Sequence, residues 1–255
     1  MIKFSIQKKH SHLIPCIAEI PEGCRKIVIL IHGILSSKES SNASFMMRYF
    51  SERGIGSIAY DQPGHGTEAA LKEPLSLKHC LESLSEVEAY LNQKYPESEI
   101  CYFASSFGAY VLGIYLSDGC YSGHCAFMRC AAVHFPQMVI DDLPENAEQR
   151  LKIQGFVSTT IGGREIQLTK TFLTELRENS LIDRFDKALA HPVDFFFVHG
   201  EQDPVVSVQA VKDFTQRHNY PLLILSKEGH TISDLPESPS IVADHAYHFF
   251  MKRLT

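Results

Sequence analysis

The chain of 255 residues contains 44% hydrophobic and 21% charged residues, a composition typical of one large folded domain, which excludes disordered and fibrous classes. Its 24 basic and 30 acidic residues give a formal net charge of -6. Because binding to nucleic acid or to an anionic membrane requires a basic surface, we expect neither of these partners.

Short apolar segments alternate with helical patterns along most of the chain, which predicts a mostly parallel sheet with helices on both faces. Two strands at residues 2–7 and 12–19 are expected to form an antiparallel edge. The expected core strands are 26–31, 57–60, 99–103, 126–134, 194–198 and 222–225. The expected helices are 43–54, 77–94, 106–116, 208–218 and 240–254. The fold class is therefore α/β, with a sheet of about eight strands.

The alternation stops between residues 138 and 190, where we expect no core strand. Helical patterns cover residues 145–156, 168–179 and 181–189, and a turn is expected at Gly162-Gly163. An insertion of this length between two core strands is typical of a cap over a site. We therefore predict a core of residues 1–137 and 191–255 and a small helical cap of residues 138–190. Helical padding on the sheet edge is the alternative.

The seven cysteines are odd in number and scattered, and no CxxC pair occurs. This usage indicates reduced thiols and a cytoplasmic protein. The N-terminal residues lack the apolar core of a signal peptide, and the longest aliphatic run, Ile27–Ile31, is too short to span a membrane. One candidate metal site is present, but because its Cys130 enters a strand-like segment, we expect a buried free thiol and no metal. The candidate ligands are Cys120, Cys125, Cys130 and His124.

A serine stands where a predicted strand runs into a predicted helix, in the segment Ala104-Ser105-Ser106-Phe107-Gly108. Such a corner holds its central residue in a strained conformation and exposes the hydroxyl above the sheet. Because the backbone passes close to itself there, the residues two before and two after the serine have to be small. Ser106 meets this condition with Ala104 and Gly108, whereas Ser105 would be flanked by two phenylalanines. Ser106 is therefore the candidate nucleophile.

This segment resembles the G-x-S-x-G nucleophile elbow of the α/β-hydrolase superfamily, with alanine at its first position, and the resemblance covers nearly the whole chain. The turn His32-Gly33, after the predicted strand 26–31, is similar to the family's His-Gly turn. It implies that the backbone N–H groups of Ile34 and Phe107 form an oxyanion hole. Asp61 and His65 belong to a loop similar to the family's D-x-x-G-H-G loop, in which they would shape the loop and do no chemistry.

The acid and the base of the triad follow the nucleophile in the chain. The segment that begins at His199 resembles the family's H-G-x-x-D-x-V sequence, which implies that Asp203 is the acid. After the last predicted core strand, the loop of residues 227–231 implies that His230 is the general base. A serine hydroxyl becomes a good nucleophile when an imidazole takes its proton and a carboxylate orients that imidazole. The weaker candidates are Glu201, Glu228 and Asp194 for the acid and His199, His245 and His248 for the base.

The resemblance implies a serine hydrolase that forms an acyl-enzyme and needs no cofactor and no metal. A serine nucleophile disfavours haloalkane and epoxide hydrolysis, in which family members use an aspartate. Because esters react more easily than amides, we expect a carboxylic ester hydrolase for small or medium acyl groups, aromatic ones included. From Gly162 onward the cap resembles the helical inserts of cinnamoyl and feruloyl esterases, so we expect the small-molecule ester to bind beside it. No oligomeric state follows from the sequence.

Two further functions stay open. One is a different reaction on the same triad, namely that of a serine aminopeptidase, a thioesterase or a carbon–carbon bond hydrolase. An aminopeptidase would need carboxylates in the cap, such as Asp141, Asp142 or Glu145, to hold the ammonium group of its substrate. The second is a receptor that binds a ligand without turnover, and the presence of all three triad residues argues against it.

Overall fold

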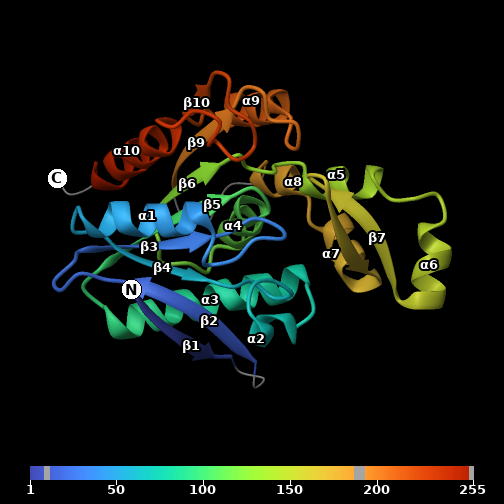
Figure 1. Cartoon of the computed structure of the whole chain (residues 1–255), viewed down its shortest axis with the longest axis horizontal. Coiled ribbons are helices and arrows are strands. Elements are labelled where there is room, and N and C mark those ends of the chain that lie inside the picture. Colours follow the sequence, from blue (N-terminus) through green and yellow to red (C-terminus); the bar gives the residue numbers. More distant parts are fainter. Residues whose placement is uncertain (9–11, 187–192, 253–255) are drawn as a thin grey trace.

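The computed structural model describes residues 1–8, 12–186 and 193–252. Eight strands form one sheet in the order β1-β2-β4-β3-β5-β6-β9-β10 (Figure 1). Strands β1 and β2 are antiparallel, β2 is antiparallel to β4, and the remaining neighbouring pairs are parallel. The predicted α/β class is therefore confirmed. The strands are β1 (Ile2–Gln7), β2 (Leu13–Glu19), β3 (Lys26–Ile31), β4 (Gly56–Tyr60), β5 (Glu99–Ser105), β6 (Cys125–Arg129), β9 (Asp194–Gly200) and β10 (Leu222–Leu225).

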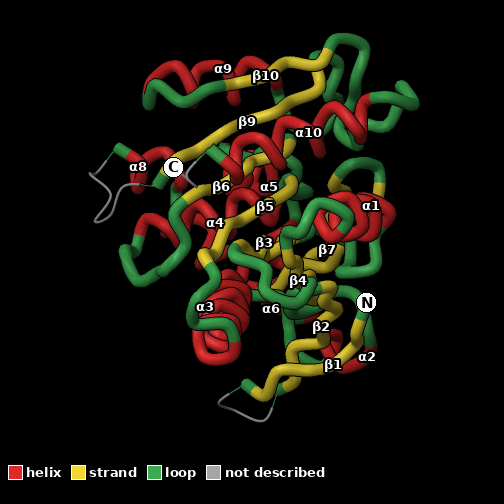
Figure 2. The backbone as a smooth tube through the Cα atoms, turned by 90° about the vertical axis from the view of Figure 1, so that its left-hand side faces the viewer, coloured by secondary structure: helices red, strands yellow, loops and turns green. Residues whose placement is uncertain are grey.

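Helices cover both faces of this sheet, as Figure 2 shows for α1 and α3 on its two sides. Helices α1 and α10 share one apolar cluster with one face, and α3, α4 and α9 share another with the opposite face. None of the helices in the described ranges is both long enough and apolar enough to cross a membrane. These helices are α1 (Ser41–Ser51), the short α2 (Glu68–Leu71), α3 (Leu77–Lys94), α4 (Phe107–Ser117), α9 (Val208–Arg217) and α10 (Ser238–Met251).

Two predicted elements end earlier than expected. The strand predicted over 126–134 ends at Arg129, because Cys130 has a φ of 45°, which an extended strand does not allow. The last helix was expected to reach residue 254, and α10 ends at Met251, while residues 253 and 254 lie outside the described ranges. The remaining predicted core elements lie within three residues of their predicted bounds, and the largest difference is at the end of α1, which was expected at residue 54 and lies at Ser51.

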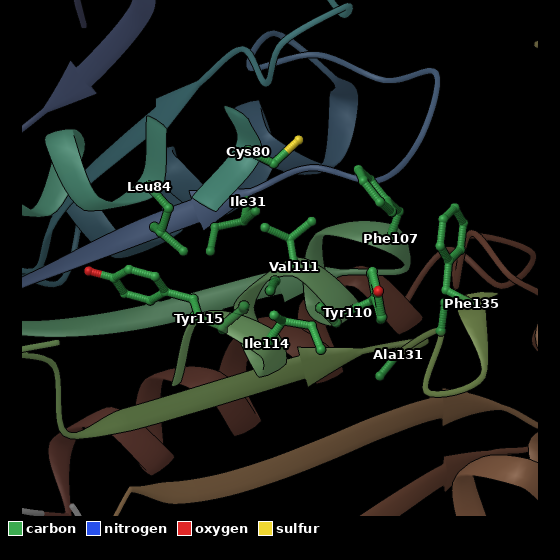
Figure 3. Packing of buried hydrophobic residues seen from close by; sticks show 14 of the residues in the cluster. Ile31, Cys80, Leu84, Phe107, Tyr110, Val111, Ile114, Tyr115, Ala131 and Phe135 are labelled. Carbon is green, nitrogen blue, oxygen red and sulfur yellow. The ribbon is translucent and has the colours of Figure 1, made fainter. Parts of the chain in front are cut away.

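Helix α4 lies within the larger apolar cluster of the core. Ten of its eleven residues are buried, which is typical of a helix with apolar residues on all sides. Figure 3 shows its Tyr110, Val111 and Ile114 packed among side chains from neighbouring elements, among them Leu84 of α3 and Ile31 of β3. Because α4 begins directly after Ser106, this packing also fixes the position of the candidate nucleophile.

The insertion between β6 and β9 contains helices, as predicted, and also a two-stranded sheet that was not predicted (Figure 1). Gly162 and Gly163 both have positive φ angles, 56° and 75°, which match a tight two-residue hairpin turn. Strands β7 and β8 flank this turn, and buried apolar residues alternate along them, for example Ile166 and Leu168. The elements are α5 (Phe135–Asp141), α6 (Ala147–Gln154), β7 (Phe156–Ile161), β8 (Arg164–Thr169), α7 (Lys170–Glu178) and α8 (Leu181–Phe185).

The bounds of the insertion helices differ from the predicted ones for local reasons. Helix α6 ends before Phe156 because Gly155 takes a left-handed conformation, with φ of 79°. Helix α7 begins at Lys170, with Thr169 as its N-cap. Residues 187–189 of the predicted helix 181–189, and the predicted end of the cap at residue 190, lie outside the described ranges.

Candidate active site

Ser106 lies in the sharp turn between β5 and α4. Its φ of 54° and ψ of -120° are unusual for a residue other than glycine and cost about 1–3 kcal/mol. The surrounding contacts hold this conformation, since the Ser106 N–H donates to the carbonyl of Arg129 over 2.9 Å. A Cβ atom on Gly108 would lie 2.5 Å from the carbonyl oxygen of Ile31, so the close approach of α4 to β3 requires glycine there.

The three residues predicted for the triad come together in the structure. The Ser106 Oγ lies 2.9 Å from Nε2 of His230, and Nδ1 of His230 lies 2.7 Å from Oδ2 of Asp203. The His230 side chain is 21% exposed and the Asp203 side chain is fully buried. A hydrogen-bond chain therefore runs from a buried carboxylate to a hydroxyl that a ligand can reach.

Asp203 is held as a carboxylate by its hydrogen bonds. Its Oδ1 accepts the backbone N–H groups of Val205 and Val206, over 2.8 and 2.9 Å. Its Oδ2 faces His230 and also Nε2 of His199, 3.2 Å away. Burial alone would raise the pKa of Asp203, but the hydrogen bonds from His199 and His230 together bring this pKa well below its ordinary value.

His199 contacts the candidate acid and lies away from the candidate nucleophile. It is fully buried, and its Nε2 lies 3.0 Å from the carbonyl oxygen of Val206. Among the weaker candidates for the acid, Glu201 is exposed, and the buried Glu228 accepts the N–H groups of Asp234 and Leu235. Asp194 lies at the opposite end of β9, and His245 and His248 lie in α10. None of these side chains has the distances to Ser106 and Asp203 that His230 has.

Arg129, at the end of β6, was not predicted to take part in the site. Its carbonyl accepts the N–H of Ser106, and its guanidinium donates to the carbonyl of Thr231, the residue after His230. Arg129 thus connects the turn of the nucleophile with the loop of the histidine. The sequence does carry a signal that could have identified Arg129, because it is a single charged residue at the carboxyl end of an apolar strand.

The two residues predicted to supply oxyanion donors lie on either side of the nucleophile turn. Ile34 follows β3 and lines the same cavity as Ser106, and Phe107 is the first residue of α4. Among the described residues, no protein acceptor takes the backbone N–H of Ile34 or Phe107. The His32 side chain stabilises the turn after β3 that carries Ile34. Its Nε2 accepts the Gln62 N–H over 3.0 Å, and its Nδ1 lies 2.8 Å from the carbonyl oxygen of Gly33.

Burial, together with the neighbouring His65, lowers the pKa of His32 to about 4, so its imidazole is neutral near pH 7. Asp61 is buried and accepts hydrogen bonds from the ammonium group of Lys38 and from the backbone N–H of Thr67, over 2.8 and 3.0 Å. These contacts stabilise the loop of residues 61–67 and do not reach Ser106 or His230. His32 and Asp61 therefore shape the loops around the site.

The four residues considered as metal ligands do not form one cluster within the described part of the chain. The Cys125 Sγ lies 3.0 Å from the Cys101 Sγ, and Cys130 lies near His199 and Asp203 instead. Burial raises the pKa of the Cys130 thiol to about 12. Cys130 is therefore a neutral thiol near pH 7.

A cavity of about 970 Å³ opens beside Ser106 and His230. The loop after β3, the beginning of α1, the loop that carries His230 and the β7–β8 hairpin all line it. The insertion contributes Ile161, Gly162 and Arg164 to the lining. Of the insertion carboxylates considered for an aminopeptidase, Asp141 and Glu145 do not line this cavity, and Asp142 lines an adjoining cavity of about 260 Å³. The larger volume suits a small organic molecule.

Solved structures share this fold over almost the whole chain. A protein from Agrobacterium vitis S4 matches with a TM-score of 0.80 at 17% sequence identity, over 97% of both chains. Est1E from Butyrivibrio proteoclasticus, with ferulic acid bound, matches with a TM-score of 0.78 at 17% identity, over 98% of this chain and 100% of that one. The esterase domain of a Rhodothermus marinus protein matches with a TM-score of 0.73 at 16% identity, over 97% of this chain and 96% of that domain.

Comparison with curated protein sequences finds no significant match. The model of the Hydrolase_4 family, described as serine aminopeptidase, S33, matches residues 22–180, which is more than half of the chain. The predicted α/β-hydrolase fold is thus confirmed by the structures and by this family match. The protein belongs to the Hydrolase_4 (serine aminopeptidase, S33) family of α/β-hydrolases.

Proposed function

We propose that the protein is a serine-dependent carboxylic ester hydrolase in which Ser106 is the nucleophile, His230 the general base and Asp203 the acid. The observation that carries the proposal is the continuous hydrogen-bond chain through these residues, with distances of 2.9 and 2.7 Å, at the side of a cavity. A hydroxyl paired with an imidazole, and an imidazole paired with a buried carboxylate, form the arrangement that nucleophilic catalysis by serine requires.

In the proposed reaction, Ser106 Oγ attacks the carbonyl carbon of the ester while His230 Nε2 takes the hydroxyl proton. The N–H groups of Ile34 and Phe107 donate to the negative oxygen of the tetrahedral intermediate. The intermediate collapses, the C–O bond to the alcohol breaks, and His230 gives its proton to the leaving oxygen. A water molecule, deprotonated by His230, then attacks the carbonyl carbon of the acyl-enzyme. The bond from this carbon to Ser106 Oγ breaks, His230 returns the proton to Oγ, and the carboxylic acid is released. Asp203 keeps the imidazole oriented and stabilises its charged form.

We further propose that residues 138–190 act as a cap that bounds the substrate cavity. The tip of the β7–β8 hairpin lines the cavity through Ile161, Gly162 and Arg164, which supports this role. The cavity volume is compatible with an acyl group of small or medium size, aromatic or aliphatic. The likeness to Est1E with bound ferulic acid and to the Rhodothermus marinus esterase domain supports an ester substrate.

The description of the family names an aminopeptidase, so amide hydrolysis is the second candidate function. An aminopeptidase binds the ammonium group of its substrate, for which a carboxylate at the cavity is the natural partner. None of the three insertion carboxylates considered for this role lines the cavity beside Ser106. Among the described residues, the lining carboxylate is that of Asp234, and its Oδ2 already accepts the backbone N–H of Gly229 over 2.7 Å, which favours an ester over a substrate with an ammonium group. Ester hydrolysis therefore remains the better supported proposal.

The test is hydrolysis of p-nitrophenyl esters from acetyl to palmitoyl, of methyl ferulate and of an aminoacyl-arylamide, by the natural protein and by Ser106→Ala. We expect ester hydrolysis with a preference below palmitoyl, and a decrease in kcat of at least about a thousandfold in the variant. Equal rates for both proteins would exclude Ser106 as the nucleophile. A preference for the arylamide would replace the esterase by the aminopeptidase, and turnover of no substrate would contradict the proposal.

A further inference from the structure

Arg164 is the one charged side chain that the described part of the insertion contributes to the cavity. It is the first residue of β8 and directly follows the Gly162-Gly163 turn, so the hairpin carries it to the cavity wall. Its side chain is exposed. The same cavity is lined by Ser106 and His230, so the proposed nucleophile and Arg164 border one cavity.

The two remaining lining residues with a permanent positive charge already have partners in the protein. The ammonium group of Lys38 lies 2.8 Å from Oδ2 of the buried Asp61. The guanidinium of Arg129 donates to the carbonyl of Thr231. Arg164, by contrast, forms no ion pair and no side-chain hydrogen bond with any residue that the structure describes. Its five N–H donors are therefore available to a ligand.

The one carboxylate on the cavity wall, within the described ranges, belongs to Asp234 in the loop that follows His230. Its Oδ2 accepts the backbone N–H of Gly229 over 2.7 Å, and it forms no ion pair with Arg164. Burial is the main cause that lowers the pKa of His65, in the loop of residues 61–66, and the charge of Arg164 adds to this effect. Arg164 and Asp234 thus belong to separate elements of the wall.

We infer that Arg164 binds a carboxylate of the substrate, so that the protein prefers esters that carry a negative charge over neutral esters of the same size. A guanidinium presents parallel N–H donors that match the two oxygens of a carboxylate, and such charge-assisted pairs are stronger than hydrogen bonds between neutral groups. This inference rests on the proposed ester hydrolysis and names the class of ester. The carboxylate belongs either to the acyl group or to the leaving alcohol.

The experiment compares kcat/KM within two pairs of esters. The mono-p-nitrophenyl ester of glutaric acid and p-nitrophenyl pentanoate place the charge on the acyl side. The butyrate esters of 4-hydroxybenzoate and of phenol place it on the leaving group. In at least one pair we expect the natural protein to prefer the anionic ester by about tenfold to a hundredfold. The pair that shows the preference identifies the side of the substrate that Arg164 contacts.

Substitutions at Arg164 test whether this residue causes the preference. Arg164→Glu is expected to reverse the anionic-to-neutral ratio, because it places a negative charge against the carboxylate, and Arg164→Lys to retain part of it. Arg177→Glu is the matched control, since Arg177 is an exposed arginine of the insertion that does not line the cavity. This control is expected to keep the natural ratio. A ratio that is the same in Arg164→Glu and in the natural protein overturns the inference.

Two further measurements separate this inference from the proposed function. If p-nitrophenyl pentanoate is hydrolysed in a Ser106-dependent way and no charge preference is found, only the role of Arg164 fails. If no ester is hydrolysed, the proposed function fails. Calorimetric titration of the Ser106→Ala protein with glutarate then still tests whether Arg164 binds a carboxylate. The inference requires a heat of binding in this protein and the loss of that heat in the double variant Ser106→Ala, Arg164→Glu. A preference for a cationic aminoacyl ester that disappears in Asp234→Asn also overturns the inference.

Discussion

The sheet core and the insertion hold their parts of the site in different ways. In the core, α4 is buried along almost its whole length, and Ser106 stands at its first turn in a backbone conformation that the surroundings enforce. In the insertion, α6 buries only Ala147, and its Ile153 is 73% exposed. The hairpin that brings Arg164 to the cavity is defined by a turn of two glycines. Dense packing thus fixes the proposed chemistry, whereas local turn geometry positions the proposed contact to the substrate.

This difference implies that the two regions tolerate change to different degrees. A substitution in the core shifts atoms that many neighbours restrain, so its cost in stability or in rate is high. A substitution in the exposed part of the insertion moves few neighbours, so it can change specificity at a low cost in folding free energy. This contrast is tested by comparing a substitution in the core with the same kind of substitution in the insertion, where both regions contain a suitable residue.

The largest effect is expected for Asp203→Asn. The asparagine keeps the shape of the side chain but removes the charge that orients His230, so kcat on a p-nitrophenyl ester should fall about ten-thousandfold, as for the analogous change in serine proteases. The control is Asp141→Asn, a carboxylate of the insertion that does not line the cavity. It should leave kcat/KM within about twofold. A loss of activity in Asp141→Asn comparable to that in Asp203→Asn would contradict the contrast between core and insertion.

A second pair of substitutions compares two glycines. Gly108→Ala should lower the free energy of unfolding by about 3 kcal/mol, because the new Cβ meets the carbonyl oxygens of Ile31 and His32 at 2.5 and 2.6 Å. Gly163→Ala in the hairpin turn should cost only about 1 kcal/mol, since its Cβ meets nothing within 4 Å and only the positive φ is strained. Urea unfolding followed by circular dichroism measures both, and equal costs would argue against a tighter core.

The third prediction concerns pH. Because the pKa of His32 is lowered to about 4 in the folded protein, the unfolded chain binds a proton at a higher pH than the folded one. The titration of His32 alone should therefore lower the unfolding free energy by about 2–3 kcal/mol as pH decreases from about 7.5 to about 4.5. His32→Gln should remove this part of the slope, and His248→Gln on the exposed side of α10 should keep it. The described insertion has no histidine and should contribute nothing to it.

Much of the core followed from the sequence because its signals are local. The requirement for small residues around the nucleophile singled out Ser106 over Ser105, and α3 has the bounds that its pattern predicted. In the structure His230 lies between Ser106 and Asp203 and contacts both, in the order that the chain and the family resemblance had implied. Their distances could not be predicted, because they depend on how β5, β9 and β10 align in the sheet.

The parts that were not predicted depend on contacts between distant residues or on turn chemistry. The β7–β8 hairpin was missed because the helical pattern was extended to Phe156, although Gly155 and the Gly162-Gly163 pair carry the signals of a helix end and a tight turn. The pairing of Lys38 with Asp61 joins two loops that are 23 residues apart in the chain. No periodicity in the sequence encodes such a contact, nor the position of Arg164 at the cavity.

The two hydrogen bonds of Arg129 have a consequence for motion. The backbone of this residue holds the nucleophile turn, and its side chain holds the loop of the histidine, so both loops are attached to the end of one strand. We therefore expect a displacement of β6 to carry the hydroxyl and the imidazole in the same direction. Two loops attached in this way should move together, so the 2.9 Å contact between Ser106 and His230 should be less sensitive to such a displacement than a contact between two independent loops.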